Sequence, residues 1–211
     1  PWKLARETLS IDHLSDGRLI LGVGLGAPEH EEFEWLGEDA DSKVRAAKLD
    51  EGLDIIAGLW TGEKFGYSGE HYQIKETVFL PRPVQSPRIP IWVAGAWPNK
   101  RPFRRAARWD GVFPVMWNEE LTPAILREIV GYTLDARADP APLEVVYSGR
   151  TPGADPAQGG EMVASFAEAG ATWWVEDLSM WRYIPWEPSK GPYTWPATEI
   201  EERIQQGPPK A

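Results

Sequence analysis

The sequence predicts an α/β fold with parallel strands: a (β/α)8 TIM barrel of which about five β/α units are present. Five short apolar runs are typical of buried strands, and a helix separates each run from the next. The segment lengths fit a barrel that takes about 250 residues when complete. The chain has 211 residues. We therefore expect one partial domain over residues 1–211, N-terminally truncated, with the first three units missing or incomplete.

A helix followed by a buried strand opens the chain. Apolar residues recur with helical spacing along Leu4–Leu14, and the turn at residues 15–17 ends this helix, because Gly17 readily adopts a left-handed conformation. The apolar run Arg18–Val23 indicates the first strand, which Gly24-Leu25-Gly26 closes. Because the chain starts at Pro1 with a helix that feeds a strand, we expect the strand before that helix to lie upstream.

The middle of the chain holds one long helix and one strand. Val44–Trp60 is amphipathic, with apolar residues at alternating spacings of four and three. Residues 67–74 are typical of a small hairpin, and several prolines punctuate the extended segment after it. The run Ile89–Ala94 predicts the second strand, which ends at Gly95.

The same alternation continues to the C-terminus. Thr122-Pro123 and Asp155-Pro156 each place a capping residue before a proline at the first helical position. The predicted elements are a helix over Lys100–Arg108, a strand over Gly111–Met116, a helix over Thr122–Ala138, a strand over Leu143–Ser148, a helix over Asp155–Ala169, a strand over Thr172–Leu178 and a last helix near Glu199–Gln206. An open doubly wound sheet is the rival fold, but residues 22–26 lack the dinucleotide-binding spacing.

Composition excludes several classes of function. A net charge of −10 argues against a nucleic-acid surface, and no apolar run approaches the length of a membrane helix. There is no cysteine, and the three histidines lack ligand spacing. His30-Glu31 begins a zinc-protease pattern, but Glu34 stands where the second histidine belongs. We expect a cytoplasmic protein with a small-molecule substrate and no metal, membrane or nucleic-acid partner.

Active sites of barrels lie at the carboxyl ends of the strands. Glycines there either let the backbone approach a flat ligand or merely form the turns. Trp97 either flanks a ring system or plugs the mouth of the barrel. The predicted cofactor-binding residues at these ends are Gly24, Gly26, Ala94, Gly95, Trp97, Gly149, Arg150 and Thr151.

The last two strand ends carry the predicted charged groups. If three strands precede Pro1, the loop after Leu143–Ser148 follows strand seven, a frequent phosphate site in barrels. Arg150 and Thr151 offer a guanidinium and a hydroxyl there, although a solvated loop fits equally well. Glu176 is the candidate catalytic base; the alternative is an ion pair with a barrel arginine.

Several motifs together resemble the bacterial luciferase-like flavin monooxygenases. The part of a family member that they resemble is its C-terminal two-thirds. They are Leu4-Ala5-Arg6, Leu14-Ser15-Asp16-Gly17-Arg18, Leu21-Gly22-Val23-Gly24-Leu25-Gly26, Arg45 with Leu49-Asp50-Glu51-Gly52-Leu53, Leu59-Trp60-Thr61-Gly62, Tyr67-Ser68-Gly69-Glu70-His71-Tyr72, and Pro81-Arg82-Pro83-Val84-Gln85 before Ile89-Pro90-Ile91-Trp92-Val93-Ala94-Gly95. The resemblance covers nearly the whole chain.

The resemblance implies an oxidoreductase that uses either reduced FMN with oxygen or an 8-hydroxy-5-deazaflavin coenzyme that transfers hydride. Ala94 and Gly95 are then expected near the side chain or phosphate of the cofactor. Family members often form dimers, so it also implies a homodimer. The alternatives are a non-catalytic barrel or binding subunit, an inactive fragment, and a sugar or phosphate-ester enzyme on the same fold. Substrate choice is expected to depend on residues 27–42, 63–88 and 179–196.

Overall fold

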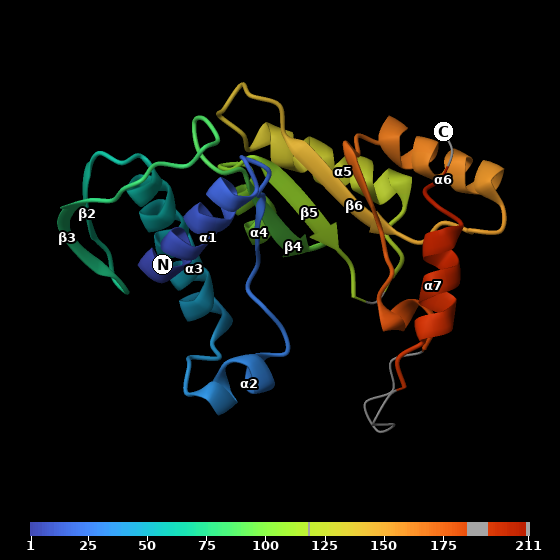
Figure 1. Cartoon of the computed structure of the whole chain (residues 1–211), viewed down its shortest axis with the longest axis horizontal. Coiled ribbons are helices and arrows are strands. Elements are labelled where there is room, and N and C mark those ends of the chain that lie inside the picture. Colours follow the sequence, from blue (N-terminus) through green and yellow to red (C-terminus); the bar gives the residue numbers. More distant parts are fainter. Residues whose placement is uncertain (118, 185–193, 210–211) are drawn as a thin grey trace.

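Five parallel strands form a curled sheet through the centre of the molecule (Figure 1). The computed structural model describes residues 1–117, 119–184 and 194–209. Along the sheet the strands are β1 (Leu21–Val23), β4 (Ile91–Ala96), β5 (Gly111–Val115), β6 (Glu144–Gly149) and β7 (Trp173–Glu176). Sheet order follows chain order without a reversal, which is the topology of a barrel wall and not of a doubly wound sheet.

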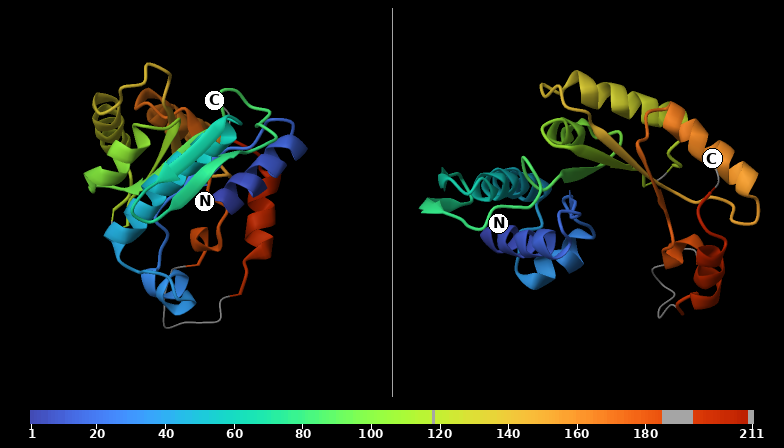
Figure 2. Two further views of the ribbon diagram at one scale, coloured as in Figure 1. Left: turned by 90° about the vertical axis from the view of Figure 1, so that its left-hand side faces the viewer. Right: turned by 45° about the horizontal axis from the view of Figure 1, so that its top comes forward.

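Helices connect the successive strands. They are α1 (Trp2–Leu14) before β1, α3 (Ser42–Trp60) between β1 and β4, α4 (Lys100–Ala106), α5 (Pro123–Asp135) and α6 (Pro156–Glu168) between the later strands, and α7 (Ala197–Gln205). Figure 2 shows α5 and α6 along the outer side of the curled sheet. The predicted caps form: Thr122 accepts from the N–H of Ile125, and Asp155 from that of Gln158. These bonds satisfy donors that a helix start leaves open.

The two faces of the sheet are identified by its glycines and tryptophans. A Cβ on Gly95 would lie 2.5 Å from Pro102 of α4, so Gly95 faces the helices. Ala94, one residue earlier, therefore faces the concave side. Trp92 is also on that side, edge-to-face with Trp173 at a ring-centroid separation of 5.3 Å. The side chains between sheet and helices form the core, which includes Val93, Phe103, Val112, Leu126 and Ile129, all fully buried.

A hairpin stands apart from the main sheet, as the sequence predicts. It consists of β2 (Lys64–Ser68) and β3 (Gln73–Val78), which pair antiparallel. Glu51 of α3 accepts hydrogen bonds from the backbone N–H groups of Glu70, His71 and Tyr72. Burial opposes ionisation of this carboxyl, but the three N–H donors outweigh it and lower the pKa of Glu51.

The predicted alternation is confirmed, but several element ends differ. The first strand begins at Leu21 instead of Arg18. Leu21 pairs with Ile91, and the next residue back on that partner strand is Pro90, which has no N–H to donate. The last strand stops at Glu176, opposite the end of β6. The sequence did not predict the short helix α2 (Glu29–Glu32) or the 3-10 turns η1 (Glu34–Leu36) and η2 (Met180–Arg182).

Candidate functional site

The predicted site residues lie in two groups at the carboxyl edge of the sheet, separated by β5. The first group lies at the ends of β1 and β4 and contains Gly24, Gly26, Ala94, Gly95 and Trp97. The second lies at the ends of β6 and β7 and contains Gly149, Arg150, Thr151 and Glu176. The structure therefore brings each group together, with one strand between the two.

On the concave side, Gly24 at the end of β1 and Ala94 of β4 form a rim with no side chain larger than a methyl group. A Cβ added to Gly24 would lie 3.4 Å from the Cβ of Ala94, so these neighbours share the concave side. Gly26 has a φ of 76°, a left-handed conformation that favours glycine. Gly24 and Gly26 also line a cavity of about 390 Å³ whose other walls include Phe33, Tyr72 and α3 residues, and the Phe33 ring covers Gly26. The rim leaves room for a planar ligand.

Arg45 of α3 holds the loop after β1 in place. Its guanidinium is buried and donates to the carbonyl oxygens of Leu25 (2.7 Å) and Gly26 (3.1 Å). Phe33 lies under the same guanidinium, 4.5 Å from its carbon to the ring centroid. Arg45 is one of the motif residues quoted above. Its structural role is to fix the loop that carries Gly26.

Trp97 turns away from the concave side. Its ring packs edge-to-face against Phe103 at 5.3 Å and Tyr132 at 6.2 Å, and the Lys100 ammonium lies 3.3 Å from its centroid. These partners belong to α4 and α5. The structure thus gives Trp97 a packing role on the helical side, and its predicted contact with a cofactor stays a prediction. Trp117, after β5, is 73% exposed.

Glu176 is the centre of the second group. Its carboxylate accepts from the Thr151 N–H (2.9 Å), the Thr151 hydroxyl (3.0 Å) and the Trp174 indole (2.9 Å). It also pairs with Arg182 at 2.6 Å and Arg203 at 3.2 Å. Burial opposes ionisation, but the indole, guanidinium and Thr151 donors outweigh it and lower the pKa of Glu176. The geometry thus shows the ion pair of Glu176 with arginines that the sequence offered as the alternative. A role of Glu176 as catalytic base stays a prediction.

Thr151 and Arg150 are likewise engaged within the protein. Thr151 is buried, and its hydroxyl also accepts from Arg203 at 2.7 Å. Arg150 donates to Asp177 at 2.7 Å, and its side chain is 48% exposed. Among the described residues the group holds three arginines (150, 182 and 203) and two carboxylates, an excess of one positive charge. Within the described residues the buried Nε of Arg203 has no hydrogen-bond partner. The excess positive charge suits an anion. The Thr151 hydroxyl, however, already hydrogen-bonds to Glu176 and Arg203.

Arg182 and Arg203 were missed by the sequence reasoning. They lie in η2 and α7, and no motif or spacing links either of them to Glu176. Part of the predicted specificity segment 179–196 (residues 185–193) lies outside the described residues. Within the part that the structure describes, no group of three metal-binding side chains occurs, and no helix has the length and apolarity to span a membrane.

Comparison with known proteins identifies the family to which the chain belongs. The profile of the luciferase-like monooxygenase family matches residues 1–172. The chain is 37% identical over 103 residues to the oxygenase component of a flavin-dependent trigonelline monooxygenase from Acinetobacter baylyi, which covers 49% of this chain and 28% of that protein. It is 30% identical over 135 residues to an F420-dependent glucose-6-phosphate dehydrogenase from Microbacterium testaceum, covering 59% and 38%.

Solved structures of F420-dependent enzymes share the fold of this chain. An F420-dependent secondary alcohol dehydrogenase, solved with an F420–acetone adduct, superposes with a TM-score of 0.65 at 15% identity, covering 82% of this chain and 68% of that one. This likeness supports the barrel architecture. The aligned segments span less than half the length of the two curated relatives. Relatives of this chain thus use flavin or the deazaflavin F420.

Proposed function

The chain belongs to the luciferase-like monooxygenase family, and from that premise we propose that it is part of a flavin- or deazaflavin-dependent oxidoreductase acting on a small organic molecule. We further propose that β1 and β7 pair with additional strands in the complete barrel, because the relatives it aligns with are longer. The concave side of the sheet is then the inner wall of that barrel.

One observation carries the proposal: the bare rim at the ends of β1 and β4. Gly24 and Ala94 offer only backbone and one methyl group on the concave side, so a planar ring can approach the main chain closely there. Such a cradle suits an isoalloxazine or deazaflavin ring. The surplus arginine charge at the ends of β6 and β7 suits an anionic part of the same ligand.

The cofactor supplies oxygen activation if it is reduced FMN, or hydride transfer if it is the deazaflavin. The protein orients the cofactor and protects it from water. Arg45 fixes the loop that carries Gly26, and the Glu176 cluster fixes the chain after β6 against β7. Trp92 and Trp173 give the concave side an apolar lining, which in the complete barrel would exclude water.

A binding titration tests the proposal. FMN and F420 are added separately to this chain, and to the chain with whatever its gene encodes before Pro1, while ligand fluorescence is followed. We expect saturable binding of one of them to at least the longer sample. The preferred ligand then decides between oxygenation and hydride transfer. Absence of binding by both samples would overturn the proposal and favour the non-catalytic barrel.

A variant pair locates the binding site. Gly24→Leu places a large side chain on the rim, so we expect it to weaken binding at least about tenfold. Gly131→Leu is the matched control, because Gly131 is exposed on α5 with open space around it. Equal affinities for the two variants would contradict a cofactor site at this rim.

A further inference from the structure

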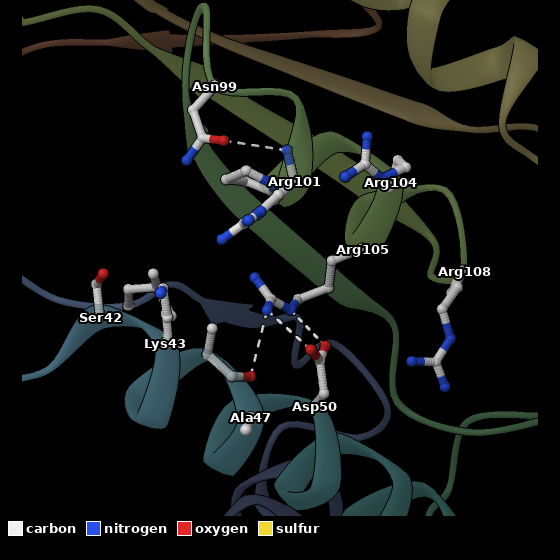
Figure 3. A pocket seen from close by; sticks show the side chains of 12 residues that line it. Ser42, Lys43, Ala47, Asp50, Asn99, Arg101, Arg104, Arg105 and Arg108 are labelled. Atoms are coloured by element: carbon white, nitrogen blue, oxygen red, sulfur yellow. Dashed lines mark hydrogen bonds and ion pairs between the residues drawn. The ribbon is translucent and has the colours of Figure 1, made fainter.

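A basic groove lies between α3 and α4, on the helical side of the sheet. Its cavity has a volume of about 490 Å³. We define the basic groove by its charged lining: Lys43 and Asp50 of α3, Arg101, Arg104 and Arg105 of α4, and Arg108 just beyond α4. Figure 3 shows the α3 and α4 side chains on its two sides. Five cations and one carboxylate thus line one concavity in a chain with a net charge of −10.

The single lining carboxylate is fully used by one of these cations. Arg105 donates from Nε to Asp50 Oδ1 at 2.5 Å and from its terminal nitrogen to Asp50 Oδ2 at 2.9 Å (Figure 3). Arg105 is buried at 8% exposure, so this pair is a fixed part of the wall. Arg108 pairs with Asp54 at 2.7 Å. Neither pair neutralises the other three cations.

Lys43, Arg101 and Arg104 form no ion pair with the part of the chain that the structure describes. Among the described residues, none of them has a carboxylate within 4 Å, and Arg104 donates to the neutral hydroxyl of Tyr132. Like charges that converge on a concavity repel one another, and they concentrate anions there. An anion with two or more charges removes that repulsion. Guanidinium groups also bind phosphate and carboxylate oxygens in pairs.

The remaining walls favour an organic body on the anion. Leu25, Ala46, Ala47 and Pro102 line the groove between the charged groups. The small alanine side chains keep the space between the helices open, and their apolar surface matches a carbon skeleton. Gly95 faces the groove side of β4 and Ala94 the concave side, so most of the groove lies behind the sheet from the concave side, and Leu25 of the loop after β1 lies where the groove comes nearest to the rim.

We propose that the basic groove binds a small organic anion with at least two negative charges, carried by phosphate or carboxylate groups. This site is distinct from the proposed cofactor rim, and it does not depend on the proposed function. Lys43 of α3 and Arg101 of α4 contact the anion from opposite walls, and Arg104 adds to the positive electrostatic potential of the groove.

Calorimetric titration tests the proposal, with inorganic pyrophosphate and citrate as separate probes at about 25 mM salt, where charge effects are weakly screened. We expect one probe or both to bind with a stoichiometry of one, and the preferred probe identifies phosphate or carboxylate as the recognised group. Lys43→Ala with Arg101→Ala should weaken binding at least about tenfold, the equivalent of one lost charge-assisted hydrogen bond.

The control is Lys75→Ala with Arg127→Ala, which removes the same charge from exposed positions on β3 and α5. It should change affinity less than about twofold, a small fraction of one hydrogen bond. No saturable binding of either probe, or equal losses in the two double variants, would overturn the proposal. If the groove variant does not fold, Lys43→Gln and Arg101→Gln are tested singly under the same criteria. Flavin titration of the same variants separates this result from the proposed function.

Discussion

Asp12 and Gln85, far apart in the chain, are joined by a partly buried hydrogen-bond network. Asp12 is fully buried in the last turn of α1, and its Oδ1 accepts from the Gln85 side-chain amide at 2.7 Å. Its Oδ2 accepts from the backbone N–H groups of Val84 (2.8 Å) and Gln85 (3.3 Å). The Gln85 amide also donates to the carbonyl oxygen of Leu19, just before β1. One carboxylate thus ties α1 and the start of β1 to the segment that leads into β4.

Replacement of Asp12 by alanine is expected to destabilise the fold strongly. The substitution removes the acceptor of donors from residues 84 and 85 at a partly buried site, which costs about 1–3 kcal/mol. Urea unfolding followed by tryptophan fluorescence measures the loss as a lower midpoint. Glu7→Ala is the control, since Glu7 is exposed on the same helix. A loss no larger than that of the control would contradict the role of Asp12.

Gly95 and Gly131 provide a pair of substitutions with opposite expected signs. A Cβ at Gly95 would lie 2.5 Å from the ring of Pro102, so Gly95→Ala pushes α4 away from β4 and should cost about 1–3 kcal/mol. Gly131 lies inside α5 with open space around it. Gly131→Ala should therefore raise stability by about 0.5–1 kcal/mol through better helix propensity. Thermal unfolding of both variants decides whether tight β4–α4 packing requires the glycine.

Glu51 is expected to control the docking of the β2–β3 hairpin. Glu51→Gln removes the charge that three backbone N–H groups share, so the hairpin turn should open more often. Hydrogen exchange measures this as faster exchange of the amides at residues 70–72, with core amides of β4 unchanged. Glu70→Gln removes the same charge from an exposed side chain in that turn and should leave the rates as they are.

The alternation of strands and helices was predictable because its signals are local. Apolar periodicity identified the five strands and the long helix α3, and the pairs Thr122-Pro123 and Asp155-Pro156 fixed two helix starts. Strand ends were less predictable, since pairing depends on the partner. The loss of residues 18–20 from the first strand follows from Pro90 on the neighbouring strand, which no pattern within residues 18–23 encodes.

The candidate site was predictable in position but not in its contacts. The rule that barrel sites lie at carboxyl strand ends located both residue groups. It did not reveal that Arg203, 27 residues after Glu176, approaches that carboxylate from α7. Trp97 follows a strand end as expected, yet its orientation is set by packing against Phe103 and Tyr132. Such contacts depend on the docking of separate elements, which is a tertiary property.

Glu176 links the site to a pH dependence that distinguishes an anchor from a catalytic base. Its pKa in the folded protein is lowered, so its contribution to stability is complete above the unfolded value of about 4.3. That contribution falls as the pH drops toward the folded pKa and is absent below both values. Stability of the wild type should therefore decline in acid more steeply than that of Glu176→Gln.

The test compares unfolding midpoints of the two proteins between about pH 3 and 7, a range that brackets the titration of a carboxyl. Glu176→Gln should be less stable at pH 7, because Arg182 and Arg203 lose the charge that they share, and the difference should shrink toward pH 3. Glu168→Gln, an exposed carboxyl at the end of α6, is the control. Equal stability of wild type and Glu176→Gln at neutral pH, with a loss of cofactor-dependent turnover alone, would instead identify Glu176 as a catalytic base.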